Sequence, residues 1–70
     1  MGTKKQIKVG DRIELVYTND ELTDLKPGDR GTVTEIEENQ VERLIWVNWD
    51  NGERLALIEG IDEFKVVREE

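Results

Sequence analysis

The 70-residue sequence contains no cysteine, no histidine and no serine. Without cysteine there is no disulfide framework and no thiolate metal site. The three absences together remove the usual nucleophile–base pairs of enzymes and the zinc sites built on sulfur and imidazole. Carboxylates remain for acid–base chemistry, but so small a domain offers little depth in which to raise a carboxyl pKa. We therefore expect a protein that is not an enzyme, has no catalytic residues and uses no metal or cofactor.

Long apolar runs are absent too. No run approaches the roughly 20 residues that span a bilayer, and the N-terminus has no apolar segment of the signal-peptide kind. We expect a soluble, cytoplasmic protein that does not contact membranes.

Positive charge is scarce, with 10 basic against 17 acidic residues and a net charge of −7. Proteins that hold nucleic acid through phosphate contacts usually carry a basic face. The only basic cluster here is Lys4, Lys5 and Lys8, close to the N-terminus. The charge balance disfavours nucleic acid as a partner.

The length fits one domain, which would bury roughly 60% of the surface that its unfolded chain exposes. Hydrophobic periodicity begins only at Ile7. We therefore predict a disordered tail over residues 1–6, a single domain over residues 7–68 and a frayed end over residues 69–70.

A Gly-Asp-Arg turn occurs twice, at Gly10 and again 18 positions later at Gly28. At the second copy Pro27 presets φ and Gly28 permits a left-handed turn residue. Gly31 then lets the backbone pass close to a neighbour. The Asp-Arg pairs are interpreted as turn caps or structural bridges, since exposed ion pairs add only about 0–1 kcal/mol each.

Period-two alternation of apolar residues predicts five short strands, over residues 12–17, 31–37, 43–49, 53–58 and 63–68. In the second strand Val33 and Ile36 are three positions apart. A β-bulge near Thr34 or Glu35 would turn both inward and bend the strand.

The sequence Asp50-Asn51-Gly52 predicts a tight hairpin between the third and fourth strands. A two-residue type I′ loop would pair Val47 with Ala56. A three-residue loop with a left-handed Gly52 would instead pair Val47 with Leu55. Only the second register separates apolar from polar side chains, so we predict it. It also pairs Ile45 with Leu57 and Asn48 with Arg54. The outer face would then carry Trp46, Asn48, Arg54 and Ala56.

Two connections complete the expected fold. Residues 18–25 read as a long ordered loop that allows one helical turn around residues 20–23, with Leu22 and Leu25 folded over the core. Residues 59–62 fit a single 3₁₀ turn in which Ile61 plugs the core. Together these features are typical of an all-β, five-stranded SH3-like (KOW-like) small barrel with one 3₁₀ turn before its last strand. Closing the sheet would remove most exposed edges.

Two segments carry a family resemblance, KVGDRIELVYTNDELTDLKPGDRGTV at residues 8–33 and VNWDNGERLALIEGIDEFKVV at residues 47–67. Through the paired motifs PGDRGTV and WDNG, the chain resembles a family of domains of unknown function. Its members are small SH3-like barrels from bacteria, archaea and phages. That family often has a proline after the Asn-Asp pair, where this chain has Glu21. The resemblance implies a fold but no activity.

The candidate binding residues are Trp46, Tyr17, Asp20, Glu21 and Asp24. A large aromatic residue on an outer face is uncommon unless something covers or binds it. With the acidic loop beside it, Trp46 would suit a cationic or proline-containing peptide. Trp49, at the mouth of the hairpin, is interpreted as a core lid. In the alternative interpretation Trp46 packs under a loop or under residues 7–9. The loop aspartates could attract a hard cation, but turn capping is the favoured role.

We therefore expect a protein-binding or accessory module, monomeric or weakly dimeric, whose partner is a protein or peptide. One alternative is a nucleic-acid-associated KOW-like module, which would need Arg12, Arg30, Arg43 and Arg54 on one face. Another is a structural component of a phage or mobile-element assembly, in which a sheet edge adds a strand to a neighbour.

Overall fold

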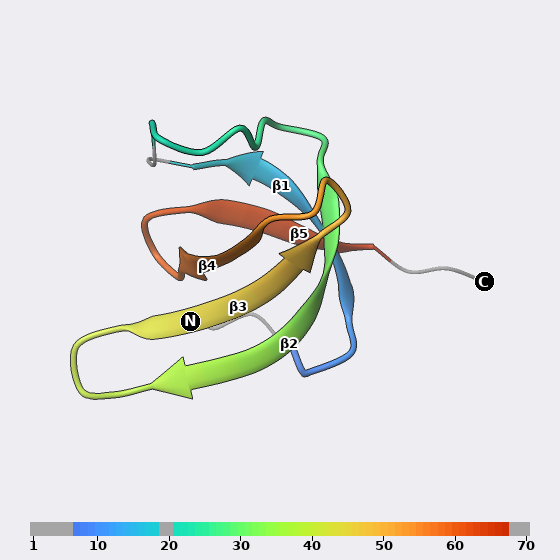
Figure 1. The fold of residues 1–70 in the computed structure, drawn as a ribbon. Helices are drawn as coiled ribbons and strands as arrows, with labels where there is room; N and C mark the ends of the chain where they lie inside the picture. Colours follow the sequence, from blue (N-terminus) through green and yellow to red (C-terminus); the bar gives the residue numbers. More distant parts are fainter. Residues whose placement is uncertain (1–6, 19–20, 68–70) are drawn as a thin grey trace.

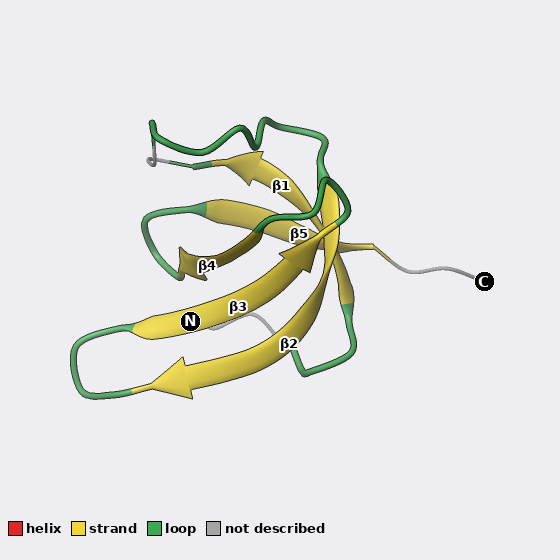
Figure 2. Cartoon of the chain, in the orientation of Figure 1, coloured by secondary structure: helices red, strands yellow, loops and turns green. Residues whose placement is uncertain are grey.

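The computed structural model describes residues 7–18 and 21–67, and these contain five β-strands and no helix (Figures 1 and 2). The strands are β1 (Arg12–Tyr17), β2 (Arg30–Glu38), β3 (Arg43–Trp49), β4 (Arg54–Ile58) and β5 (Glu63–Val67). The predicted all-β class and the five strands are confirmed. The predicted tail, the predicted frayed end and Asp20 lie outside the described residues.

The strands form one antiparallel sheet in the order β4-β3-β2-β1-β5. The predicted closure into a barrel is not formed by hydrogen bonds, because β4 and β5 remain the two edges of the sheet. Local hydrogen bonds fix the turn that follows β4. The N–H of Ile58 donates to Asp62 Oδ2 at 2.9 Å, and its carbonyl accepts from the N–H groups of Ile61 and Asp62.

β2 bends where a bulge was predicted. Its pairing with β3 shifts between Val33, which faces Val47, and Glu35, which faces Trp46. Thr34 is therefore the extra residue, and the strand curves visibly in Figure 1. The bulge lets Val33 reach the core and packs the partly buried Ile36 against it.

The β3–β4 hairpin has the three-residue loop and the register that the sequence predicts. Val47 pairs with Leu55, and Asn48 pairs with Arg54. Gly52 has a φ of 99°, and its N–H donates to the Trp49 carbonyl at 2.9 Å. Alternation along the strands then leaves Trp46 on the face opposite the core.

The two Gly-Asp-Arg turns have the same internal geometry. Gly10 and Gly28 have φ values of 100° and 101°, as the sequence predicts for Gly28. In each turn the aspartate Oδ2 accepts a hydrogen bond from the N–H three residues earlier, at 3.0 Å in both. These aspartates cap their turns, as expected. The caps are Asp11 on Lys8 and Asp29 on Lys26.

Each turn is also bonded to the strand that follows the other turn. The Gly10 N–H donates to the Val33 carbonyl at 2.8 Å, and the Gly28 N–H donates to the Leu15 carbonyl at 2.8 Å. Val33 and Leu15 return the bond to the carbonyls of Asp11 and Asp29. Positions 10 and 28 and positions 15 and 33 differ by the same 18 residues, so the β1–β2 pair has a local pseudo-two-fold relation.

At the centre of this relation Ile13 pairs with Gly31. Ile13 is fully buried, whereas a Cβ at Gly31 would lie 2.7 Å from the Asn48 carbonyl oxygen and 2.9 Å from the Trp49 Cα. The predicted close passage at Gly31 is confirmed. Here β3 approaches the backbone of β2 so closely that only glycine fits.

The core lies inside the curve of the sheet. All five strands contribute apolar side chains to it, and so do one loop residue and one residue that precedes β1. Its members are Ile7, Ile13, Leu15, Leu25, Val33, Ile45, Val47, Trp49, Leu57 and Phe64. Trp49 closes the core as predicted, with its Nε1–H bonded to the Leu55 carbonyl. Leu25 is buried as predicted, but the same prediction for Leu22 is wrong, because its side chain is 96% exposed.

The turn between β4 and β5 corrects another prediction. Residues 59–62 form a turn with Gly60 at a φ of 100° and no 3₁₀ helix. Ile61 is 50% exposed and does not plug the core. The buried residue is Asp62, whose carboxylate accepts hydrogen bonds from the Ile58 N–H and the Thr18 hydroxyl. A carboxylate that satisfies these donors stabilises the turn in a way that an isoleucine side chain cannot.

Candidate functional site

Trp46 lies in the middle of β3 on the outer face of the sheet, as the hairpin register predicts. Its neighbours across the sheet are Glu35 on β2 and Ala56 on β4. Trp46 is partly buried even though it faces away from the core. Side chains of the same outer face must therefore cover part of its ring.

Two charged side chains hold the indole in place. The Nε1–H of Trp46 donates to Glu37 Oε1 at 3.1 Å, and the guanidinium carbon of Arg54 lies 4.8 Å from the ring centroid. Arg54 Nη2 also lies 3.5 Å from Glu35 Oε1. A cation–π contact at an exposed site contributes about 0.5–1 kcal/mol. These contacts orient the ring and leave the whole group at the solvent boundary.

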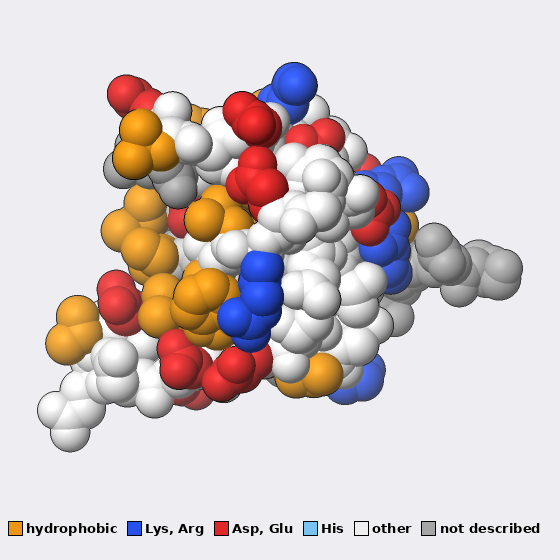
Figure 3. Space-filling model, viewed as in Figure 1, with side chains coloured by type: hydrophobic (Ala, Val, Ile, Leu, Met, Phe, Trp, Pro, Cys, Tyr) orange, Lys and Arg blue, Asp and Glu red, His pale blue; other side chains and the backbone are white. Residues whose placement is uncertain are grey.

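Apolar side chains continue this face along β3 and β4. Leu44 pairs with Ile58 and Trp46 pairs with Ala56, all four are partly buried, and all four alternate with core residues. We call the set the Trp46 surface: Glu35, Glu37, Leu44, Trp46, Arg54, Ala56 and Ile58. Figure 3 shows apolar side chains gathered over this region of β3 and β4, bordered by basic and acidic side chains.

The acidic loop is attached to a different place, the β3–β4 turn. Thr23 Oγ1 donates to Glu53 Oε1 at 2.6 Å, and the N–H of Asp24 donates to Glu53 Oε2 at 3.2 Å. The hydrogen bond from Thr23 lowers the pKa of Glu53, with smaller contributions from the Asp24 N–H and from Asn51. The loop is thereby tied to the end of the hairpin.

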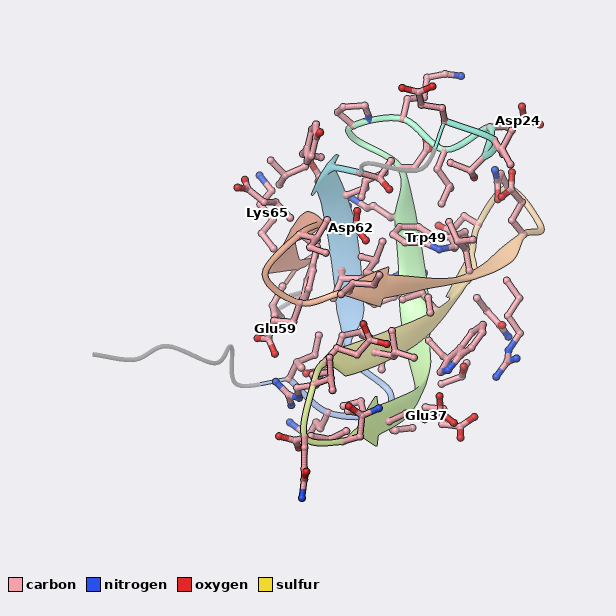
Figure 4. The ribbon with its side chains drawn as sticks, turned by 90° about the vertical axis from the view of Figure 1, so that its left-hand side faces the viewer. Asp24, Glu37, Trp49, Glu59, Asp62 and Lys65 are labelled. Atoms are coloured by element: carbon pink, nitrogen blue, oxygen red, sulfur yellow. The ribbon has the colours of Figure 1, made fainter. Side chains whose placement is uncertain are left out.

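The predicted binding residues do not all meet. Glu21 and Asp24 are exposed on the loop, and Tyr17 lies at the end of β1, half exposed and paired with Glu63. Figure 4 places Asp24 and Glu37 at opposite ends of the molecule, and Glu37 is the residue that holds Trp46. Within the described part of the chain, the carboxylates beside Trp46 are Glu35 and Glu37. Alternation around the β2 bulge was the sequence signal for them.

The four arginines that would form a nucleic-acid-binding face each lie against a carboxylate. The nitrogen–oxygen distances are 2.7 Å for Arg12–Asp50, 3.1 Å for Arg30–Glu14, 3.0 Å for Arg43–Glu59 and 3.5 Å for Arg54–Glu35. The hydrogen bond from Arg12 lowers the pKa of Asp50. The positive charges are therefore locally neutralised.

Residues 7–18 and 21–67 contain no group of three or more carboxylates, histidines or cysteines placed to hold a metal. They also contain no helix long and apolar enough to cross a membrane. A hollow of about 430 Å³ lies between the β2–β3 turn and Gly60. Another of about 540 Å³ lies between Val16 and the start of β5.

The chain matches a known protein family. A family model described as a domain of unknown function (DUF4314) matches residues 2–67. No curated protein and no solved structure matches the chain.

Proposed function

This chain belongs to the DUF4314 family of domains of unknown function, and we propose that it is a non-enzymatic SH3-like barrel that binds another protein. The fold assignment is supported by five short antiparallel strands, a bulged second strand and a tight β3–β4 hairpin. The absence of histidine, cysteine and serine supports a binding role over a catalytic one.

The observation that carries the proposal is the state of Trp46. Its indole lies on the outer face of the sheet, and the hydrogen bond from its Nε1–H to Glu37 orients it in the chain alone. Tryptophan and arginine are the side chains that most often dominate protein interfaces. A partner that binds a side chain already held in one orientation loses less conformational entropy. The Trp46 surface is therefore the proposed interface.

Site-specific photo-crosslinking tests this interface. A photoreactive phenylalanine derivative is placed at Asn48, which is exposed on the same face of β3, and at Lys65 on β5 as the matched control. In cells, the Asn48 position should yield a discrete crosslinked protein and the Lys65 position should not. Trp46→Ala should abolish the crosslink while circular dichroism shows an intact sheet. A crosslink that survives Trp46→Ala would contradict the proposal.

The same experiment addresses the two alternatives. Crosslinking from Lys65 alone would favour an assembly role through the β5 edge. A nucleic acid crosslinked in place of a protein would favour the KOW-like alternative. The carboxylates beside Arg12, Arg30, Arg43 and Arg54, together with the net charge of −7, support a protein partner over a nucleic acid.

A further inference from the structure

We propose that the Trp46 surface receives an arginine side chain of the partner protein, and that Arg54 occupies this position until the partner displaces it. The inference rests on the proposed function, because it names the chemistry that the same surface recognises. It adds a ligand class, the guanidinium group, and an internal competitor for that ligand.

The contacts of Arg54 show what the surface accepts. Its guanidinium lies over the Trp46 ring at 4.8 Å and reaches Glu35 Oε1 at 3.5 Å. An aromatic face beside a carboxylate suits guanidinium better than ammonium, because guanidinium is planar, weakly hydrated and able to stack. A partner's arginine would make these same contacts.

The side chains that surround the ring carry more negative than positive charge, which favours a further cation. Glu35 and Glu37 both lie beside Trp46, and Arg54 contacts the ring and Glu35. Glu37 uses Oε1 for the indole N–H, so its other oxygen can accept a second donor. The chain as a whole carries a net charge of −7, which attracts a basic segment to this face.

Arg54 is also the arginine that is easiest to displace among the four pairs. Its contact with Glu35 is the longest of the four, and the two side chains are 52% and 54% exposed. The Arg43–Glu59 pair, in contrast, is 3.0 Å long with side chains only 15% and 16% exposed. Exposed pairs of this kind contribute little stability. Ala56 pairs with Trp46, and its small side chain does not obstruct access to the ring from β4.

The test is a titration of ¹⁵N-labelled protein with N-acetyl-arginine amide, followed through the Trp46 indole N–H resonance. N-acetyl-citrulline amide, the neutral analogue, is the control ligand. Arg54→Ala should bind the arginine probe about three- to fivefold more tightly than the native chain, because one cation–π competitor is removed. Arg30→Ala, which removes an arginine paired with Glu14, should leave the affinity unchanged.

Glu35→Gln with Glu37→Gln should abolish binding of the arginine probe. The inference is overturned if Arg54→Ala binds no more tightly than the native chain, or if citrulline binds as well as arginine. Should Arg54→Ala fail to fold, Arg54→Gln serves in its place, since it keeps two of the three methylene groups and removes the positive charge. If a protein crosslinks from Asn48 but added N-acetyl-arginine amide does not compete with it, the partner binds this surface without an arginine. That result would keep the proposed function and overturn only the arginine inference.

Discussion

The two Gly-Asp-Arg turns share a backbone and differ in what surrounds it. Both have a left-handed glycine, an aspartate cap at 3.0 Å and a 2.8 Å bond from the glycine N–H to the other repeat's strand. The side chains then diverge. Arg12 makes two hydrogen bonds to Asp50 of the hairpin, whereas Arg30 pairs with Glu14 on the neighbouring strand.

The residues at the centre differ most. Ile13 fills the core, while its partner Gly31 has no side chain because β3 passes against it. The backbone hydrogen bonds therefore repeat wherever the turn sequence repeats. The side chain allowed at the central position depends on β3, which lies against Gly31 and not against Ile13.

The largest effect is expected at Gly31. Gly31→Ala should lower the free energy of unfolding by about 3 kcal/mol, because the new methyl group would overlap backbone atoms of Asn48 and Trp49. Gly28→Ala, where a Cβ meets nothing within 4 Å, should lose only the cost of its positive φ, about 1–2 kcal/mol. Urea denaturation of both variants measures the difference. Equal losses would mean that β2 can move away from β3.

The two aspartate caps should be equivalent. Asp11→Ala and Asp29→Ala should each lose about 1 kcal/mol, since each variant removes one hydrogen bond to a backbone N–H. The additional contact of Asp11 with Lys8 is 3.7 Å long and the lysine side chain is 84% exposed, so it should add little. The same urea series provides the measurement. If only one of the two variants loses stability, the two turns are not equivalent even in their backbone hydrogen bonds.

The smallest effect is expected at Arg12. Its hydrogen bond lowers the pKa of Asp50 in the folded chain. A lowered folded pKa stabilises the fold at pH values above the ordinary carboxyl pKa, and this stabilisation is lost as the pH falls through the lowered value. Arg12→Gln should move the Asp50 pKa upward and flatten this acid-side loss. Carboxyl ¹³C titration of Asp50 measures the shift.

Arg30→Gln is the matched control for that titration. Arg30 lowers the Asp50 pKa only through its more distant charge, so this variant should move the pKa less than Arg12→Gln does. An equal shift in both variants would show that Asp50 senses overall charge and not its hydrogen bond with Arg12.

Features set by neighbouring residues were predictable from the sequence. The hairpin register follows from Gly52 and the alternation around it, and the bulge follows from the spacing of Val33 and Ile36. Features set by distant atoms were not. Hydrophobicity alone places Ile61 inside, but the free N–H of Ile58 is satisfied by the carboxylate of Asp62. The sequence pattern cannot show where an edge strand leaves its hydrogen-bonding groups.

The candidate surface divides in the same way. The outward orientation of Trp46 beside Arg54 follows from the hairpin register, and it was predicted. The carboxylates that accompany it were missed, because the prediction took the acidic loop as the neighbour of Trp46 and did not follow the parity of β2 past the bulge. If the register of Val33 and Val47 continued without the bulge, Thr34 and not Glu35 would pair with Trp46. One extra residue in β2 therefore decides that Glu35 and Glu37 lie beside the ring.

The order of the sheet has a consequence for synthesis. β2, β3 and β4 each pair with the strand made just before them, whereas β5 pairs with β1, the first strand made. The pair between Leu15 and Phe64 can therefore form only after β2, β3 and β4 have been synthesised. Until the last strand emerges, β1 presents an unpaired edge that another nascent chain can occupy.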